Sequence, residues 1–236
     1  MTRPRAIGEA LLEGNRRLRL AGSPTPRLDA EVLLAHATAR DRAWVLAHPE
    51  APLDEHAVFE AVLARRAAGE PIAYIRGFKE WHSLRIRTDA RALIPRPETE
   101  LLADAAVAET RDRLARGPVA VHEVATGSGA VALVLALELR HALASRRLTL
   151  IATDLSPDAL ELAAENLRAH GVRPLVSLAR ADLLEPPGDS LPRADVVIAN
   201  LPYVASAEVD ERRGSLGYEP RVALDGGPDG LDLLRR

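Results

Sequence analysis

The fold of this chain is decided by the stretch VAVHEVATGSG, which occupies residues 119–129. Residues 119–124 are mainly apolar and predict a buried strand. The small residues Gly127, Ser128 and Gly129 then predict a tight turn into a helix over residues 130–139, where the main chain can approach a ligand closely. Such a turn also serves simply to pack a helix on a strand, and this one lacks the full dinucleotide spacing and the phosphate-loop lysine. The turn therefore does not identify a ligand by itself.

The residues that follow continue the same alternation of strand and helix. Further strands are predicted at residues 148–153, 175–179 and 194–199, with a second helix at residues 157–169. Short apolar strands separated by helices specify a parallel sheet covered by helices on both faces. Right-handed crossovers place the carboxyl ends of all strands at one edge, where ligands of such sheets bind. The predicted fold class is therefore α/β, with a Rossmann-like parallel sheet.

The preceding part of the chain predicts two other kinds of structure. Apolar residues recur at helical spacing from Ile7 to Ala68, which predicts a small helical bundle in which Asp29 caps the second helix. Alternating apolar residues over 72–88 predict a two-stranded ribbon. We expect a helical substrate-docking domain over residues 1–70, a ribbon linker over 71–92, and the sheet domain over 93–236; the pattern alone leaves open a mere packing role for the bundle.

A stiff proline-rich segment joins the ribbon to the sheet domain. It reads Pro-Arg-Pro-Glu-Thr-Glu at residues 95–100 and precedes a helix predicted over 101–114. The acidic residues Glu98 and Glu100 suit the start of that helix, because negative charge is favourable there. The alternative interpretation is that Arg96 and Glu98 line a ligand cleft and bind substrate.

The composition excludes several classes of chemistry. The 236 residues contain no cysteine, a net charge of -3, and only one lysine, Lys79. The absence of cysteine excludes disulfides and thiolate metal sites, and the single lysine disfavours Schiff-base chemistry. The scattered histidines show no metal-binding spacing. An aromatic content of 3% disfavours a stacking surface for nucleic acid. No stretch reaches membrane-spanning length, so we expect no membrane contact. We also expect a cytoplasmic monomer with no metal and no direct nucleic-acid partner.

Two predicted strands end in acidic residues suited to a nucleoside. Asp154 follows the second strand, where a carboxylate can accept hydrogen bonds from both ribose hydroxyls of an adenosine. Asp182 and Leu183 follow the third strand and suit an adenine, through an acceptor for its amine and an apolar face for its ring. The alternatives are that Asp154 caps the helix that starts near Pro157 and that Asp182 is an ordinary loop residue.

The fourth strand ends in Asn200-Leu201-Pro202-Tyr203. An amide or aryl amine nitrogen is a poor nucleophile, so an enzyme that uses one must grip its hydrogens and aim its lone pair. The Asn200 side-chain oxygen and the Leu201 carbonyl can accept these hydrogens, Pro202 keeps Leu201 extended, and Tyr203 offers a ring for a planar group. Together with the nucleoside residues, this motif predicts in-line methyl transfer from S-adenosylmethionine to nitrogen.

With these motifs the chain resembles the bacterial release factor glutamine methyltransferases. The resemblance runs from about Ile7 to the last residue, and its most specific parts are the segment at residues 93–100 and the loop from Tyr218 to Gly227. It implies methylation of the glutamine amide in the Gly-Gly-Gln loop of peptide-chain release factors, with S-adenosylmethionine as donor. It also implies cofactor contacts and a glutamine clamp. The cofactor-binding residues would be Glu123, Ala125, Thr126, Gly127, Ser128, Gly129, Asp154, Asp182, Leu183 and Asn200. The catalytic and substrate-binding residues would be Asn200, Leu201, Pro202 and Tyr203.

The chain departs from the pattern of that family in four respects. The family usually has aspartate at Glu123, glycine at Ala125 and proline at Leu201, so we expect weaker cofactor binding if Ala125 requires a positive φ. The family's sheet has seven strands, and three have no counterpart before Arg236; we therefore expect a truncated sheet with an exposed edge and weak activity. Two alternatives stay open: an adenine methyltransferase acting on RNA or DNA, whose family shares Asn-Leu-Pro-Tyr, and an inactive binding remnant.

Overall fold

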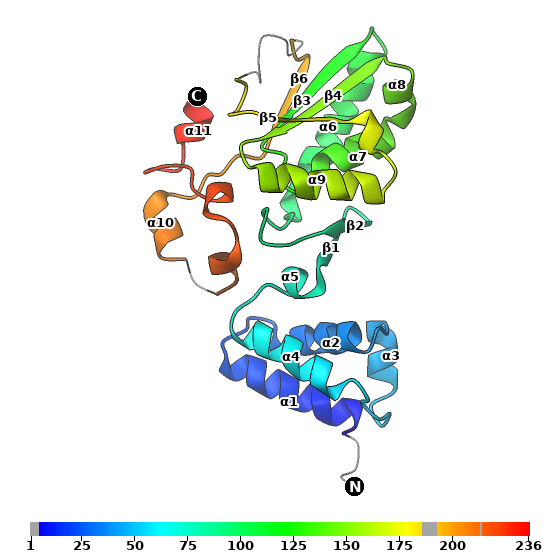
Figure 1. The fold of residues 1–236 in the computed structure, drawn as a ribbon, viewed down its shortest axis with the longest axis vertical. Helices are drawn as coiled ribbons and strands as arrows, with labels where there is room; N and C mark the ends of the chain where they lie inside the picture. Colours follow the sequence, from blue (N-terminus) through cyan, green and yellow to red (C-terminus); the bar gives the residue numbers. More distant parts are fainter. Residues whose placement is uncertain (1–4, 186–192, 213) are drawn as a thin grey trace. The chain divides into compact units, whose positions relative to one another are not determined.

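The computed structural model describes residues 5–185, 193–212 and 214–236, and their contacts form two compact units (Figure 1). The first unit comprises residues up to Gly77 together with residues 214–218. The second comprises Phe78–Arg212 and Glu219–Arg236. No helix in the described ranges combines the length and apolar character that a membrane span needs. The predicted boundaries at residues 70 and 92, and the docking role of the first domain, stay predictions.

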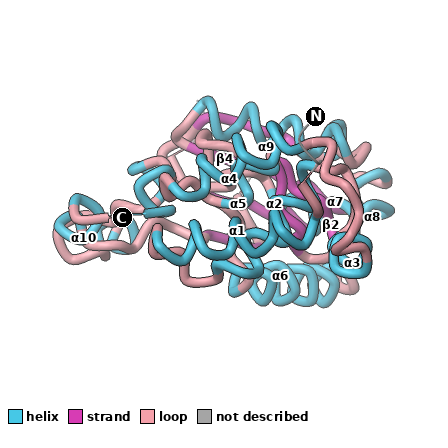
Figure 2. Tube along the Cα trace, turned by 90° about the horizontal axis from the view of Figure 1, so that it is seen from below, coloured by secondary structure: helices cyan, strands magenta, loops and turns pink. Residues whose placement is uncertain are grey.

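The first unit is a small bundle of helices. Its helices are α1 (Ile7–Leu20), α2 (Pro26–Ala37), α3 (Arg42–Ala47), α4 (His56–Ala67) and α5 (Ile72–Arg76), with a 3₁₀ turn, η2, at Gly214–Tyr218. Figure 2 shows α1, α2 and α4 running close together. Leu18, Leu33, Phe59 and Leu63 are fully buried between them, as the helical spacing predicts.

Two predictions for this unit are wrong. Asp29 does not cap α2, because Thr25 occupies the N-cap position and Asp29 lies one turn inside the helix, where its own amide already bonds to the Thr25 carbonyl. Its buried carboxylate instead accepts from Arg66 Nε at 2.7 Å. The residues from Ile72 were predicted to be extended, but they form α5, since Pro71 precedes the first turn and the left-handed Gly77 ends the last.

The ribbon itself begins at Phe78. Strands β1 (Phe78–Trp81) and β2 (Leu84–Arg87) pair antiparallel, with Lys79 opposite Ile86. Trp81 and Ile86 are buried in the core of the second unit, so the ribbon forms part of that core. The alternating pattern over residues 72–88 therefore predicted strands correctly at residues 78–81 and 84–87, but not at residues 72–76, which are helical.

The second unit contains the predicted parallel sheet. Its strands β3 (Val119–Val124), β4 (Leu148–Asp154), β5 (Ser177–Arg180) and β6 (Val196–Ala199) are all parallel, in the order β5-β4-β3-β6. The other elements are α6 (Glu98–Leu114), α7 (Ala130–Glu138), α8 (Arg140–Ala144), α9 (Pro157–Ala169), α10 (Ser206–Asp210), α11 (Asp232–Arg235) and the 3₁₀ turns η1 (Arg173–Leu175) and η3 (Arg221–Ala223). The α/β class and the parallel sheet are thereby confirmed.

The core of this unit lies mainly on one face of the sheet. Val121, Leu150 and Ile198 point to that face and pack with α7, whose first seven residues are all buried. On the alternate positions Thr149 is exposed and Val197 is 50% exposed, whereas His122 and Ile151 are buried, so the opposite face is covered only in part. The third strand also begins later than predicted, at Ser177, because Arg173–Leu175 forms a 3₁₀ turn.

Candidate functional site

A cavity of about 550 Å³ lies at the carboxyl ends of the parallel strands. The ends of β3, β4 and β6 contribute to its wall, and so do the loop after β5, residues of the 91–99 segment and residues of the 220–225 loop. It brings together most of the predicted site. The predicted residues in its lining are Arg96, Glu123, Ala125, Thr126, Gly127, Ser128, Asp154, Asp182, Leu183, Asn200, Leu201 and Pro202. Three predicted residues, Glu98, Gly129 and Tyr203, are described by the structure but lie outside the lining.

The turn after β3 depends on left-handed backbone. Ala125, Gly127 and Gly129 have φ values of 54°, 56° and 75°. A Cβ on Gly129 would lie 2.8 Å from the Cβ of Ala163 on α9, so only glycine allows this approach. Ala125 thus has the positive φ that was the condition for the predicted weaker cofactor binding, and an alanine is strained in this conformation. The weaker binding itself stays a prediction.

Asp154 connects the end of β4 to this turn. Its Oδ2 accepts from Gly127 N at 2.8 Å, and its Oδ1 accepts from Ser156 N at 2.9 Å. The cap of α9 is Ser156, whose side chain accepts from Ala159 N. Burial raises the pKa of Asp154, while the backbone donors oppose that change. Each carboxylate oxygen has a further lone pair, so the residue suits hydroxyl donors of a bound nucleoside.

Glu123 is a buried carboxyl group in the cavity wall. Its exposed fraction is 4%, and burial raises its pKa to about 8. Oε2 of Glu123 has no hydrogen-bond partner within residues 5–185, 193–212 and 214–236. A buried acceptor left without a donor costs stability, and a cationic or hydrogen-bonding ligand would satisfy it. The residues present therefore fit the ammonium-bearing, adenosine-containing cofactor that the sequence predicts.

Asn200 lies at the end of β6, opposite the start of α6. Its Nδ2 donates to Thr99 Oγ1 at 3.3 Å, its Oδ1 accepts no hydrogen bond from the residues that the structure describes, and the residue lines the cavity. The segment beyond it pairs with the later loop, because Val204 N donates to Leu224 O and Gly226 N donates to Val204 O, each at 2.9 Å. A Cβ on Gly226 would lie 2.8 Å from the Pro202 carbonyl oxygen. The Asn-Leu-Pro-Tyr backbone is therefore held by a loop that only glycine permits.

Tyr203 lies outside the lining of the cavity, and Asp182 lines the cavity but already has a partner within the protein. Tyr203 is 69% exposed, where a large planar partner can reach it. Asp182 lines the cavity, but its Oδ2 also accepts from Arg236 Nη2 at 2.8 Å.

Glu219 is a residue of this site for which sequence reasoning gave no role. Its side chain is 1% exposed, its Oε1 accepts from Arg96 Nη2 at 2.6 Å, and its Oε2 accepts from Ile94 N at 3.0 Å. Two ribbon residues hold the same segment, since Lys79 Nζ donates to Pro95 O and Trp81 Nε1 to Arg96 O. Burial and the nearby Arg96 lower the pKa of Lys79. The signal in the sequence was the Tyr-Glu-Pro run before the glycine loop, which marks the segment but not its partner.

Comparison with known proteins identifies relatives of this chain. Residues 9–77 match the family model described as the PrmC N-terminal domain. A release factor glutamine methyltransferase of Moorella thermoacetica is 41% identical over 100% of this chain and 78% of its own length. Those of Rhodopirellula baltica and Koribacter versatilis are each 37% identical, over 92% and 100% of this chain and 73% and 80% of their own lengths.

Among solved structures, the human Mettl16 catalytic domain in complex with MAT2A 3′UTR hairpin 1 aligns with a TM-score of 0.48 at 15% identity, over 74% of this chain and 60% of that chain. The relatives of Moorella thermoacetica and Koribacter versatilis match the whole chain, and therefore both compact units and the cavity lining. By these relatives, the chain belongs to the release factor glutamine methyltransferase family.

Proposed function

We propose that this chain transfers a methyl group from S-adenosylmethionine to the side-chain amide of the glutamine in the Gly-Gly-Gln motif of peptide-chain release factors. The observation that carries the proposal is the cavity, which places the turn after β3, Asp154 and the Asn200–Pro202 backbone around one space of about 550 Å³. A donor nucleoside and a carboxamide can therefore occupy neighbouring positions. Family membership supports the same reaction.

The residues at the donor end of the cavity bind and orient the cofactor. Asp154 and the left-handed turn would hold the ribose and the methionine moiety of the donor, and Glu123 would face its ammonium group. Asp182 and Leu183 would contact the adenine. When bound, the cofactor supplies an activated methyl group on its sulfonium. The cavity wall is mainly apolar at Leu93, Val131 and Leu183, which helps to exclude water from the donor.

The residues at the acceptor end bind and aim the amide. Asn200 Oδ1 and the Leu201 carbonyl would each accept one amide hydrogen, so that the nitrogen lone pair points along the line of transfer. No strong base is required, because the nitrogen loses its proton more readily once methylated and water can accept it. Alignment and desolvation would thus provide the rate enhancement. The helical unit would dock the release factor, in the cytoplasm, to a monomeric enzyme.

Methyl-labelled S-adenosylmethionine with purified release factors tests the proposal. We expect label in the peptide that contains Gly-Gly-Gln, and we expect Asn200→Ala to abolish it while cofactor affinity stays within a few-fold. Label that nuclease removes from added RNA or DNA would instead establish the adenine methyltransferase. Equal loss of methylation and cofactor binding in Asn200→Ala would show that Asn200 binds the cofactor rather than the amide.

A further inference from the structure

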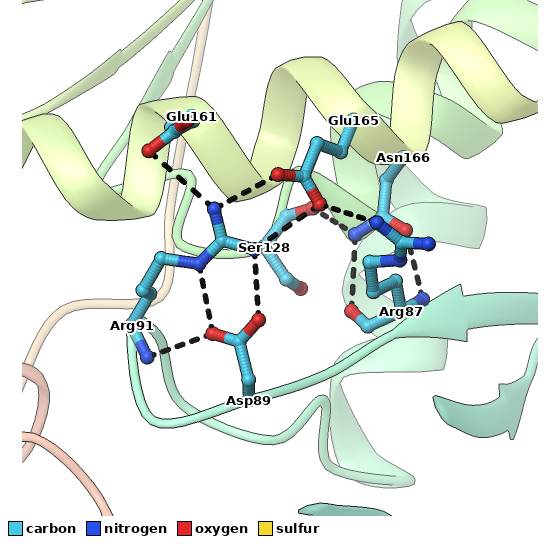
Figure 3. Close-up of polar contacts among 7 residues, drawn as sticks. All are labelled: Arg87, Asp89, Arg91, Ser128, Glu161, Glu165 and Asn166. Carbon is cyan, nitrogen blue, oxygen red and sulfur yellow. Dashed lines mark hydrogen bonds and ion pairs between the residues drawn. The ribbon is translucent and has the colours of Figure 1, made fainter. Parts of the chain in front are cut away.

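The buried side chain of Asn166 connects two segments of the chain that lead into the cavity wall. It lies on α9 and is 1% exposed. Its Nδ2 donates to Ser128 O at 2.9 Å and to Arg87 O at 3.1 Å, and its Oδ1 accepts from Arg87 N at 2.8 Å (Figure 3). Both amide hydrogens and one oxygen lone pair are therefore used. Rotation of the amide by half a turn would face oxygen against two carbonyls, so its orientation is unique.

The two partners of Asn166 belong to different parts of the site. Ser128 lies in the left-handed turn after β3. Two amides of this turn form hydrogen bonds, because Gly127 N donates to Asp154 Oδ2 and Gly129 N donates to Thr126 O. Arg87 is the last residue of β2, from which the chain continues into the segment that lines the cavity from Arg91 onward. The helix α9 thus supports the turn at two successive contacts, through Ala163 under Gly129 and Asn166 under Ser128.

Ion pairs hold the same segment to α9 without touching the turn. Arg91 lines the cavity and pairs with Glu165 at 3.0 Å and with Asp89 at 2.8 Å, and Arg87 pairs with Glu165 at 2.8 Å (Figure 3). Hydrogen bonds from Arg91 and then Arg87 lower the pKa of Glu165 to about 2. Figure 3 shows these ion pairs beside the Asn166 contacts, along the same face of α9. Glu165 therefore offers a neighbouring contact whose loss would loosen the segment but spare the turn.

We propose that Asn166 is a positioning residue for the cofactor end of the site. By holding the Ser128 carbonyl, it keeps the turn in its left-handed conformation, and by holding Arg87 it sets the distance between that turn and the segment from Arg91 to Arg96. The inference rests on the proposed function only for the identity of the ligand, because the conformation of the turn is a property of the free protein.

The test compares Asn166→Asp with Glu165→Gln. The aspartate has the same shape but presents oxygen to the Ser128 and Arg87 carbonyls in place of the two donors. Hydrogen–deuterium exchange of the cofactor-free protein is measured over a peptide that includes residues 125–129, and S-adenosylhomocysteine affinity is measured by calorimetry. We expect Asn166→Asp to raise both the exchange rate of the turn and the dissociation constant about tenfold, since a buried carbonyl loses its donor. Glu165→Gln loosens the segment but spares the turn, so it is expected to leave the exchange rate of the turn within about twofold and to raise the dissociation constant less than Asn166→Asp does.

Wild-type exchange and affinity in a folded Asn166→Asp protein would overturn the inference, and so would equal effects from Glu165→Gln. If Asn166→Asp lacks a cooperative thermal transition, Asn166→Ala is compared by the same two measurements, with the same expected and contrary results. A wild-type protein that binds S-adenosylhomocysteine but labels no release factor contradicts the proposed function alone. A wild-type protein that does not bind it contradicts the cofactor assignment, and the exchange rate of the turn then decides the role of Asn166.

Discussion

Ala125 and Glu123 occupy surroundings that their side chains do not favour. Ala125 has a left-handed φ of 54°, and Glu123 is a 4% exposed carboxyl group with an unpaired oxygen. Backbone strain and unsatisfied polar groups cost stability and concentrate where ligands bind. Glu123 lies near the end of β3 and Ala125 in the turn that follows it, and both line the cavity, so the site itself accounts for these costs.

The strain at Ala125 predicts that glycine stabilises this position. An alanine in left-handed backbone costs about 1–2 kcal/mol, and glycine offsets part of this gain by its greater freedom in the unfolded chain. We expect Ala125→Gly to raise the free energy of unfolding by about 0.5–1 kcal/mol in urea titrations. The control is Ala136→Gly in the interior of α7, which should lower it by about 1 kcal/mol or more. Destabilisation by both changes would show that Ala125 is unstrained.

The burial of Glu123 predicts a pH dependence of stability. Its pKa is about 8 in the folded protein against an ordinary value of 4.5, so the folded state binds more protons between these values. The contribution of this group to the free energy of unfolding therefore falls as pH rises from 4.5 to about 8. We expect the melting temperature of Glu123→Gln relative to wild type to rise between pH 5 and pH 9, as measured by circular dichroism.

Glu165 provides the opposite control for this pH series. Its pKa is lowered to about 2, so its stabilising effect is present above about 4.5 and is lost on acidification. Glu165→Gln should therefore lower the melting temperature by the same amount at pH 6 and pH 9. A difference between wild type and Glu123→Gln that stays constant from pH 5 to pH 9 would contradict the raised pKa of Glu123.

At the scale of elements, the end of β6 meets the first turn of α6. Thr99 lies in that turn, where its amide donates to the Arg96 carbonyl, and its hydroxyl accepts from Asn200 Nδ2 at 3.3 Å. The start of the helix thereby restrains the Asn200 side chain beside the cavity. The proline-rich entry to α6 holds Thr99 in place, since Trp81 donates to the Arg96 carbonyl from the ribbon.

This contact predicts a catalytic effect that depends on the hydroxyl of Thr99. Thr99→Val has nearly the same shape but removes the hydroxyl, so the Asn200 side chain loses this hydrogen bond and is held less firmly against the glutamine. We expect kcat/KM for release factor to fall about fivefold to tenfold, because one hydrogen bond contributes about 1 kcal/mol. Thr99→Ser should restore most of the loss. The affinity for S-adenosylhomocysteine should be unchanged in both variants; a parallel loss of affinity would place Thr99 at the donor end.

At the scale of the whole molecule, contacts between distant parts of the chain close the site. Glu219 lies 123 residues from Arg96 in sequence and 125 from Ile94, yet both of its carboxylate oxygens bond to that segment. It lies where the chain returns to the sheet unit after residues 214–218, which pack with the helical unit. The residues after it, from Pro220 to Ala223, line the cavity. A single buried carboxylate thus joins two walls of the cavity.

Loss of this carboxylate is expected to destabilise the protein. Glu219→Gln leaves the Arg96 guanidinium without its charged partner while keeping the side-chain shape. A broken buried pair costs about 3–5 kcal/mol, and the 33% exposure of Arg96 reduces this to about 2 kcal/mol. Asp112→Asn removes a partner of the exposed pair with Arg116 and should cost less than about 0.5 kcal/mol. Equal values in denaturant titrations would mean that the Glu219 contact contributes nothing beyond a surface pair.

The sequence by itself determined the parallel sheet, the strand ends that carry the site, and the helix that starts at Pro157. These follow from local patterns, because apolar runs, glycine turns and prolines act over a few residues. Its error at Asp29 arose because a distant partner, Arg66, binds the carboxylate. Its error at residues 72–76 arose because Pro71 and Gly77 bound a short helix that the apolar pattern did not indicate. Only the tertiary structure decided the left-handed φ at Ala125 and the roles of Glu219 and Asn166, because these depend on backbone that packing brings together from far along the chain.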